Sequence, residues 1–310
     1  MNKVSASAVP PTTIAAYLDQ LRDALIGADP ALIQDALYDA EEHLRSELAE
    51  NRGVSEADLL ARMATTYGVP EEVAEIYRDK EIQITRALRT PPRKPAQSML
   101  GSFFGVVADP RAYASLFYMV LSLATGIFYF TFVVTGLSLS AGLAFLIIGI
   151  PFALLFLGLV HVLSLVEGRI VEVMLGERMP RRPAYADSET GFWARIANLI
   201  TDPYTWTTML YFIMMLPLGI IYFTIMVTGL SVSAAFVTAP FFRIFNGSWF
   251  DVTVDGSSFT QNWFFLGDVW LPMVFVLGVA GLLTMLHVAR GIGYLHGQIA
   301  KVLLVRYPAN

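Results

Sequence analysis

The chain has 310 residues, of which 55% are hydrophobic and only 15% are charged. Soluble domains carry about 25% charged residues, so this composition excludes an ordinary soluble protein and indicates a membrane protein. Residues 1–100 hold 16 acidic and 11 basic side chains, and the rest of the chain is neutral. No basic surface for nucleic acid is therefore expected. The chain has no cysteine, which excludes disulfides, thiolate metal sites and a cysteine nucleophile.

The first ninety residues predict a small bundle of four helices. Thr12 or Thr13 can cap the first helix, which ends near Gly27. Asp29-Pro30 supplies an N-cap and a proline at the first position of the second helix. Ser55 begins a capping-box-like start to the third, and Gly68-Val69-Pro70 separates the third from the fourth. A helical domain over residues 1–90 follows from these signals.

Three segments of this head share a pattern with a known domain. They are residues 17–21, Asp35 to Leu44 with Asp39-Ala40-Glu41-Glu42-His43-Leu44, and Tyr67-Gly68-Val69-Pro70-Glu71-Glu72-Val73-Ala74. Over about residues 13–85 the chain resembles the HAAS-type helical domain. The resemblance implies a cytoplasmic domain of a bacterial membrane protein linked to signalling and transcriptional control.

Residues 91–108 are expected to be a basic linker followed by an interfacial helix. Arg93 and Lys94 lie close to the first apolar run, and Arg86 and Arg89 precede them. Such a segment is attracted to anionic membrane lipid, with roughly 1 kcal/mol for each charge near the surface. Membrane lipids are therefore predicted partners.

The membrane region contains an internal repeat. Residues 109–141 recur at 202–234, and sixteen of the thirty-three aligned positions are identical without a gap. A helix needs about 20 apolar residues to cross a bilayer, and each copy is long enough. The sequence predicts two membrane hairpins, in residues 109–180 and 202–310, joined by a loop at 181–201. Their four spans are expected at 113–137, 143–161, 205–230 and 269–288.

Lysine and arginine predict the orientation of these spans. The expected turn at 138–142 has neither residue, and the stretch 231–268 has only Arg243. By the positive-inside rule, both termini should be cytoplasmic. The first hundred residues contain no apolar run, so no cleavable signal peptide is expected. The predicted location is the bacterial inner membrane, with multiple spans.

A second correspondence links the ends of the two hairpins at an offset of 129 positions. It predicts an amphipathic cytoplasmic surface helix after each hairpin, with Ile170 and Ile299 as candidates for coupling to the head. The offset grows from 93 to 129, so the second copy has thirty-six extra residues, and the extracytoplasmic insertion among them is expected at about 241–265. This insertion is rich in aromatic residues and has a β-hairpin-like pattern at Asp251–Gly256. The paired oily positions are Val166, Ile170, Val173 and Met174 with Leu295, Ile299, Val302 and Leu303.

The repeated unit carries a second resemblance. Both copies begin with Asp-Pro, have a tyrosine at 118 or 211, and the second contains Pro217-Leu218-Gly219. Over about residues 105–308 this unit resembles the sensor domain of bacterial membrane signalling proteins, which implies a sensing role. No kinase transmitter follows it within these residues, so kinase activity is not expected.

The candidate ligand-binding residues lie in two places. Thr131 and Thr135 with their copies Thr224 and Thr228 could line a cavity between the hairpins, or could serve helix packing. In the insertion, Trp249, Asp251 and Trp263 could bind a lipid-like ligand, or could belong to an aromatic belt at the membrane interface.

Ionisable residues form two further groups. Asp35, Asp39, Glu42 and His43 lie at helical spacings and could hold a cation, but a solvated face around a structural histidine is favoured. Asp39, Glu42 and His43 are then candidates for contact with a cytoplasmic partner. The second group lies near the inner ends of the spans, where anchoring at the interface is favoured: His161, Glu167, His287, Arg290 and His296.

Taken together, the patterns predict an all-α protein with a cytoplasmic bundle and four membrane helices. The favoured function is a membrane signalling protein that senses an envelope or lipid-like cue and passes it to a cytoplasmic protein through the head. An accessory subunit of a transporter or lipid-handling complex is the alternative, and a homo-oligomer is compatible with either. No catalytic motif is present, so no enzymatic activity, cofactor or metal is expected.

Overall fold

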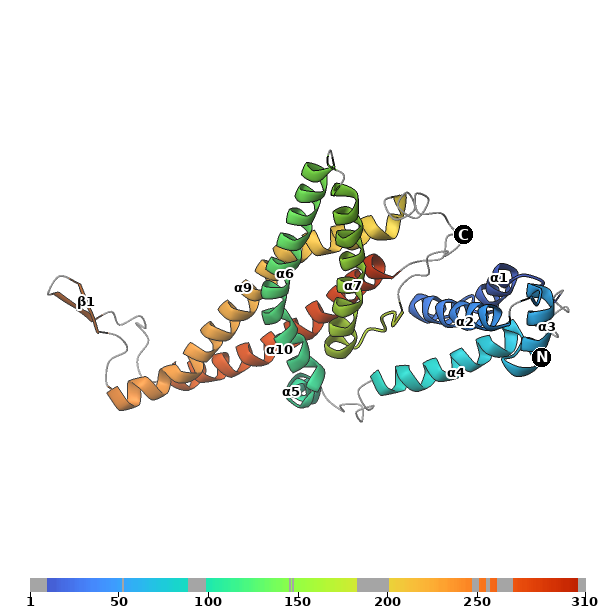
Figure 1. The fold of residues 1–310 in the computed structure, drawn as a ribbon. Coiled ribbons are helices and arrows are strands. Elements are labelled where there is room, and N and C mark those ends of the chain that lie inside the picture. Colours follow the sequence, from blue (N-terminus) through green and yellow to red (C-terminus); the bar gives the residue numbers. More distant parts are fainter. Residues whose placement is uncertain are drawn as a thin grey trace. The chain divides into compact units, whose positions relative to one another are not determined.

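The computed structural model describes residues 10–51, 53–88, 99–144, 146, 148–182, 201–246, 251–254, 257–260 and 270–305. Across these residues the fold is helical apart from one short β-hairpin (Figure 1). Four of the helices are long and apolar enough to cross a membrane. The prediction of an all-α fold with a transmembrane domain is confirmed.

The head is a bundle of α1 (Ile14–Ala24), α2 (Pro30–Glu50), α3 (Glu56–Thr66) and α4 (Pro70–Leu88). The predicted caps form: the side chain of Thr13 accepts the Ala16 N–H, Asp29 accepts the Ala31 N–H, and Ser55 accepts the Asp58 N–H. Leucines from the apolar stripes fill a single core, in which Leu21, Leu25 and Leu44 are fully buried. Gly68 has a φ of 109°, which favours glycine at the turn into α4.

The four candidate membrane helices are longer than the predicted spans. They are α6 (Pro110–Leu143), α7 (Gly149–Leu175), α9 (Pro203–Asn246) and α10 (Leu271–Leu304); α5 (Met99–Gly105) and a 3-10 turn, Val106–Ala108, precede them. The boundaries predicted for the second span and its surface helix are wrong, because 149–175 is one continuous helix. No glycine or proline interrupts residues 159–167, so the helix continues until Gly176, whose φ of 77° ends it.

The chain separates into two compact units. Met1–Pro91, Gly136–Tyr211 and Gln298–Asn310 form one, here called the head unit. Pro92–Thr135 and Phe212–Gly297 form the other, here called the crossing unit. In the head unit, Gly136 of α6 faces the ring of Phe156 on α7, where any larger side chain would overlap that ring.

The crossing unit is built on a close approach of α6 and α9. A β carbon added to Gly126 would meet the Met215 carbonyl oxygen at 2.5 Å, and one added to Gly219 would meet that of Ser122 at 2.4 Å. Both pairs correspond at the repeat offset of 93. Small residues therefore let the two backbones touch, as is common between membrane helices.

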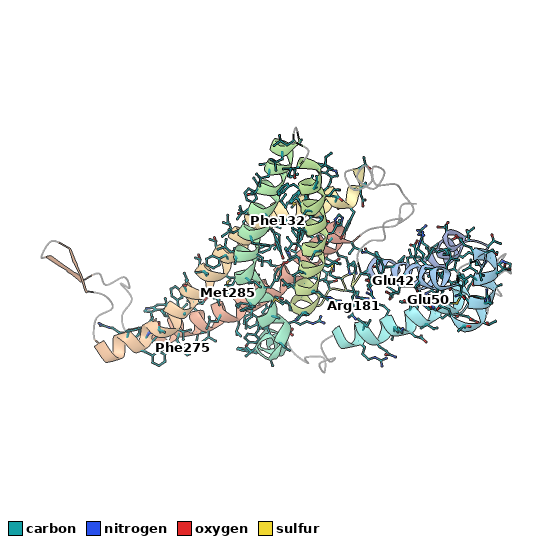
Figure 2. The ribbon with its side chains drawn as sticks, in the orientation of Figure 1. Glu42, Glu50, Phe132, Arg181, Phe275 and Met285 are labelled. Atoms are coloured by element: carbon teal, nitrogen blue, oxygen red, sulfur yellow. The ribbon has the colours of Figure 1, made fainter. Side chains whose placement is uncertain are left out.

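Further along, α10 packs on α9 in the same unit. Met285 and Phe275 both lie on α10 (Figure 2). Met285 reaches the position where a β carbon of Gly229 would lie, and the rings of Phe275 and Phe241 are 6.0 Å apart. Phe156 and Met285, which contact Gly136 and Gly229, correspond at the offset of 129. Positions that the sequence alignment pairs thus make matching contacts.

The predicted insertion contains both helix and strand. Its first residues continue α9 to Asn246, so the start predicted at 241 lies inside that helix. Strands β1 (Asp251–Val254) and β2 (Ser257–Thr260) pair antiparallel, with Asp251 opposite Thr260. The hairpin expected from the pattern at 251–256 is confirmed.

Candidate functional site

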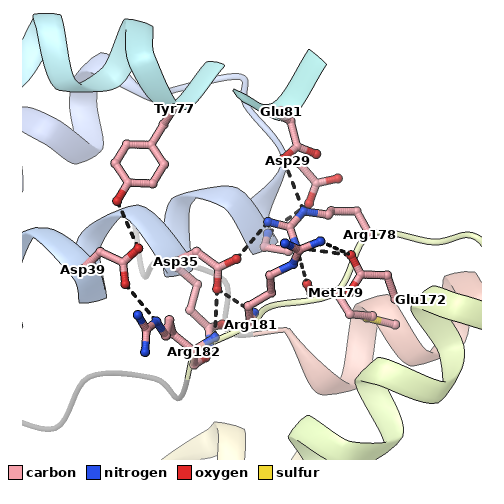
Figure 3. Close-up of polar contacts among 12 residues, drawn as sticks. Asp29, Asp35, Asp39, Tyr77, Glu81, Glu172, Arg178, Met179, Arg181 and Arg182 are labelled. Atoms are coloured by element: carbon pink, nitrogen blue, oxygen red, sulfur yellow. Dashed lines mark hydrogen bonds and ion pairs between the residues drawn. The ribbon is translucent and has the colours of Figure 1, made fainter. Parts of the chain in front are cut away.

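The most concentrated polar site lies within the head unit, around one buried arginine. Arg178 follows Gly176 at the end of α7 and is 6% exposed. Its guanidinium binds carboxylates from three helices: Asp35 of α2 at 2.9 Å, Glu81 of α4 at 3.2 Å and Glu172 of α7 at 3.5 Å (Figure 3). One side chain therefore ties two helices of the head to the end of a candidate membrane helix. We call these four residues the Arg178 cluster.

Backbone groups complete the binding of Asp35. Its Oδ1 accepts the N–H groups of Arg181 at 2.6 Å and Arg182 at 2.9 Å, while Oδ2 accepts from Arg178 (Figure 3). Next to it, the amide of Gln34 donates to the Arg182 carbonyl oxygen at 2.9 Å. The first turns of α2 thus bind residues 178–182 through main chain as well as side chains, which fixes the register of the contact.

The electrostatics of this site reflect burial and the close pairing of opposite charges. Burial raises the pKa of Asp35, against the lowering effect of the Arg181 backbone N–H, Arg178 and the Arg182 backbone N–H. For Arg178, burial acts to lower the pKa, but Asp35, Glu81 and Glu172 outweigh it and raise it. The arginine stays charged, and the Asp35 carboxyl takes up a proton more readily than a carboxyl in water.

A second contact joins the head to α10. Lys301 Nζ binds Asp29 Oδ2, while Asp29 Oδ1 caps α2 by accepting the Ala31 N–H. Lys301 occupies the position that corresponds to Glu172 at the repeat offset of 129. The head therefore binds the ends of α7 and α10, one from each repeat, through side chains of opposite charge.

The acidic residues predicted on α2 do not gather around one point. Asp39 accepts from the Tyr77 hydroxyl at 3.1 Å and pairs with Arg182 at 2.9 Å, while Asp35 belongs to the Arg178 cluster. Glu42 is exposed, and the His43 ring lies 4.6 Å from that of Tyr67. Among the described residues, no three His, Asp or Glu side chains are placed to hold a metal ion.

The remaining predicted site residues are dispersed. Thr131, Thr135, Thr224 and Thr228 all lie on exposed faces of α6 and α9. The side chain of Asp251 lies outside the described residues, as do Trp249 and Trp263. Ile170 and Ile299 are half-buried within α7 and α10, and no separate surface helix carries them.

Two ionisable residues are buried within the protein, although the sequence predicted that they anchor the chain at the membrane interface. That prediction is wrong for Glu167 and His296, which are both 0% exposed. In the head unit, the Tyr211 hydroxyl donates to Glu167 Oε1 at 3.0 Å. In the crossing unit, the Tyr118 hydroxyl lies 2.6 Å from His296 Nε2, and the Tyr222 hydroxyl lies 3.4 Å from Nδ1.

Sequence reasoning missed the Arg178 cluster and the roles of these tyrosines. An arginine after a glycine cap looks like a solvated loop residue, and only tertiary packing buries it. A signal was present for the tyrosines, because Tyr118 and Tyr211 are identical across the repeat in otherwise variable surroundings. Glu167, an acid at the end of a long apolar run, was a second signal.

Comparison with known proteins places the membrane region in a family. Residues 118–304 match the family described as "Putative sensor", and this match spans more than half of the chain. It covers α7, α9 and α10 completely and α6 from Tyr118 onwards. No curated protein and no solved structure matches the chain. The four candidate membrane helices and the matched segment together make this chain a member of the "Putative sensor" family of membrane proteins.

Proposed function

We propose that this protein is a bacterial inner-membrane signalling protein whose output is the docking of its helical head. The observation that carries the proposal is Arg178, a buried charge bound to Asp35 and Glu81 of the head and to Glu172 of α7. Membership of a sensor family supports a sensing role. The same membership favours a function other than catalysis.

The chemistry of the Arg178 cluster suits a contact that can be broken. A buried ion pair adds little net stability, since the cost of removing charges from water offsets their attraction. Once the head separates, water would hydrate Asp35 and Glu81 on the head and Arg178 after α7, so the undocked state is also accessible. Such a balance is what a two-state element requires if a cue is to shift its population.

We place the head on the cytoplasmic side, because the head and the residues around 164–204 carry most of the lysine and arginine. In this arrangement a lipid-like or envelope cue acts on the membrane helices or on the β1–β2 side. The head then presents a different surface to a cytoplasmic protein. The Asp35 edge of α2, covered in the docked state by residues 178–182, is the surface that would become free.

The test compares head contacts in the docked and undocked proteins. A photo-crosslinking residue is placed at position 34, where Gln34 is 8% exposed and covered by Arg182. In cells, Arg178→Ala should raise cross-linking from this position to a cytoplasmic protein several-fold, because three carboxylates lose their shared cation. Arg62→Ala, at an exposed position of α3, is the matched control and should change nothing.

Two results would contradict the proposal. Cross-linking from position 34 that stays within the chain in both wild type and Arg178→Ala would show that docking hides no partner surface. A gain of the same size in Arg62→Ala would show that the response is not specific to the Arg178 cluster.

A further inference from the structure

Two residues near the end of α7 bind other segments of the head unit. Glu167 accepts a hydrogen bond from Tyr211 of α9, and Glu172 binds Arg178. Both acids are buried. They are five residues apart, which is about 7.5 Å along a helix axis. A short rigid piece of helix thus connects α9 to the cation that binds the head.

The repeat contains the same arrangement on α10. His296 corresponds to Glu167 and forms a hydrogen bond with the Tyr118 hydroxyl. Lys301 corresponds to Glu172 and binds Asp29 of the head. Tyr118 and Tyr211 correspond to each other at the offset of 93. In both cases the tyrosine comes from one repeat and its partner from the other.

The contact at Glu167 is costly if it serves only to hold helices together. Nearby, α9 and α7 also meet through two neutral hydroxyls, Tyr204 and Ser164, at 3.1 Å. A buried polar pair adds little net stability, but it is demanding about position, because breaking its hydrogen bond inside the protein is unfavourable. The bond therefore favours a matching movement of Glu167 when Tyr211 moves with α9.

We propose that Tyr211–Glu167, with its counterpart Tyr118–His296, is a coupling joint that passes movement of the membrane helices to the head. Movement of α9 shifts Glu167, the helix carries the shift to Glu172, and the Arg178 cluster loosens or tightens. Tyr118 acts in the same way on α10 and Lys301. The inference deepens the proposed function and rests on it, since head docking is the output that the joint controls.

The absence of cysteine makes the joint testable by single-site labelling of the full chain in membranes. Gln34→Cys replaces the amide that donates to Arg182 with a thiol at the same buried position, so its reaction with a maleimide reports the undocked fraction. The missing hydrogen bond is common to all variants, because each is compared on this same background. On this background, Tyr211→Phe removes one hydroxyl and keeps the ring. We expect labelling to become roughly threefold to tenfold faster, in line with the loss of one ordinary hydrogen bond. Tyr118→Phe should act in the same direction.

Controls separate coupling from general loosening. Tyr294→Phe removes a hydroxyl from α10 at a position that is 60% exposed, and labelling should not change. A thiol at exposed Glu50, introduced as Glu50→Cys, should react at one rate in every variant. If Tyr211→Phe is poorly recovered from membranes, Glu167→Gln keeps an acceptor for the Tyr211 hydroxyl in a side chain of the same size, and a smaller acceleration is expected.

The outcomes distinguish the joint from the proposed function. If Arg178→Ala accelerates labelling of Gln34→Cys but neither tyrosine variant does, the coupling joint is wrong while the proposed function stands. If Arg178→Ala also has no effect, the Arg178 cluster does not hold the head, and both proposals fail. Equal acceleration by Tyr294→Phe and Tyr211→Phe would likewise contradict the joint.

Discussion

The backbone of Gly126 lies so close to Met215 that a β carbon on the glycine would come within 2.5 Å of the Met215 carbonyl oxygen. The neighbour that would have to move is main chain, which cannot adopt another rotamer. The contact between α6 and α9 therefore depends on glycine at this position, and on Gly219 at the corresponding one.

We predict opposite effects of alanine at two glycines in the membrane helices. Gly126→Ala should destabilise the protein by about 1–3 kcal/mol, because overpacking forces the helices apart. Gly158→Ala on α7 meets nothing within 4 Å and should stabilise by up to about 1 kcal/mol through helix propensity. Thermal unfolding in detergent, followed by fluorescence-detected size exclusion, measures both. Equal melting temperatures for the two variants would rule out the close crossing.

The head should fold without the membrane region. Its four helices enclose a core of their own, so residues 10–90 should give a helical circular dichroism spectrum and a cooperative melt. Leu21→Ala, at a fully buried position, should cost about 2–5 kcal/mol and largely abolish the fold of so small a domain. Ile26→Ala, at a position that is 71% exposed, is the control. A coil-like spectrum for the unmodified fragment would show that the head needs its docking contacts.

Asp35 should make a measurable contribution to the pH dependence of stability. Its pKa is raised in the folded protein, so the native state binds this proton more tightly than the unfolded chain. The contribution of Asp35 is fully present below the ordinary carboxyl pKa of about 3.9 and is lost as the pH rises through the raised value. The stability of wild type relative to Asp35→Asn should therefore increase as the pH is lowered from 7 towards 4.

Melting temperatures of the two proteins across that range test this sign. Their difference isolates Asp35, because the other carboxyl groups titrate in both. A difference that shrinks on acidification would show that Arg178 and the backbone N–H groups of Arg181 and Arg182 outweigh burial.

The orientation of the chain is open to direct labelling. We expect a membrane-impermeant maleimide added to intact cells to modify Ser257→Cys, in strand β2, and to spare Ala57→Cys in the head. Permeabilised cells supply the control, since both thiols should then react. Labelling of the head alone in intact cells would reverse the topology.

The head could be predicted from sequence because its signals are local. Asp29-Pro30 and the Ser55 box act within one turn, and the helices begin where these residues predict. The long helices could be predicted to exist but not to end correctly. His161 and Glu167 were expected near the inner end of the second span, whereas both lie within the continuous helix α7 and form hydrogen bonds there.

The site could not be predicted because its partners are far apart in the chain. Asp35 and Arg178 are 143 positions apart, and nothing near either residue specifies the other. Each tyrosine forms its hydrogen bond with a residue of the other repeat, which depends on how the two hairpins pack. The repeat pattern does not determine that packing. Aligned positions reveal which residues are equivalent, but not whether each one bonds within its own copy or to the other.

The opposite charges at Glu172 and Lys301 have a consequence for how the head can bind. If the two repeats were identical here, the head could bind either of two equivalent sites. Instead, the site at Glu172 is anionic and binds Arg178, whereas the site at Lys301 is cationic and binds Asp29 directly. A head bound in the opposite orientation would bring the carboxylate of Asp29 against that of Glu172. The opposite charges at these two positions thus leave the head one favourable orientation.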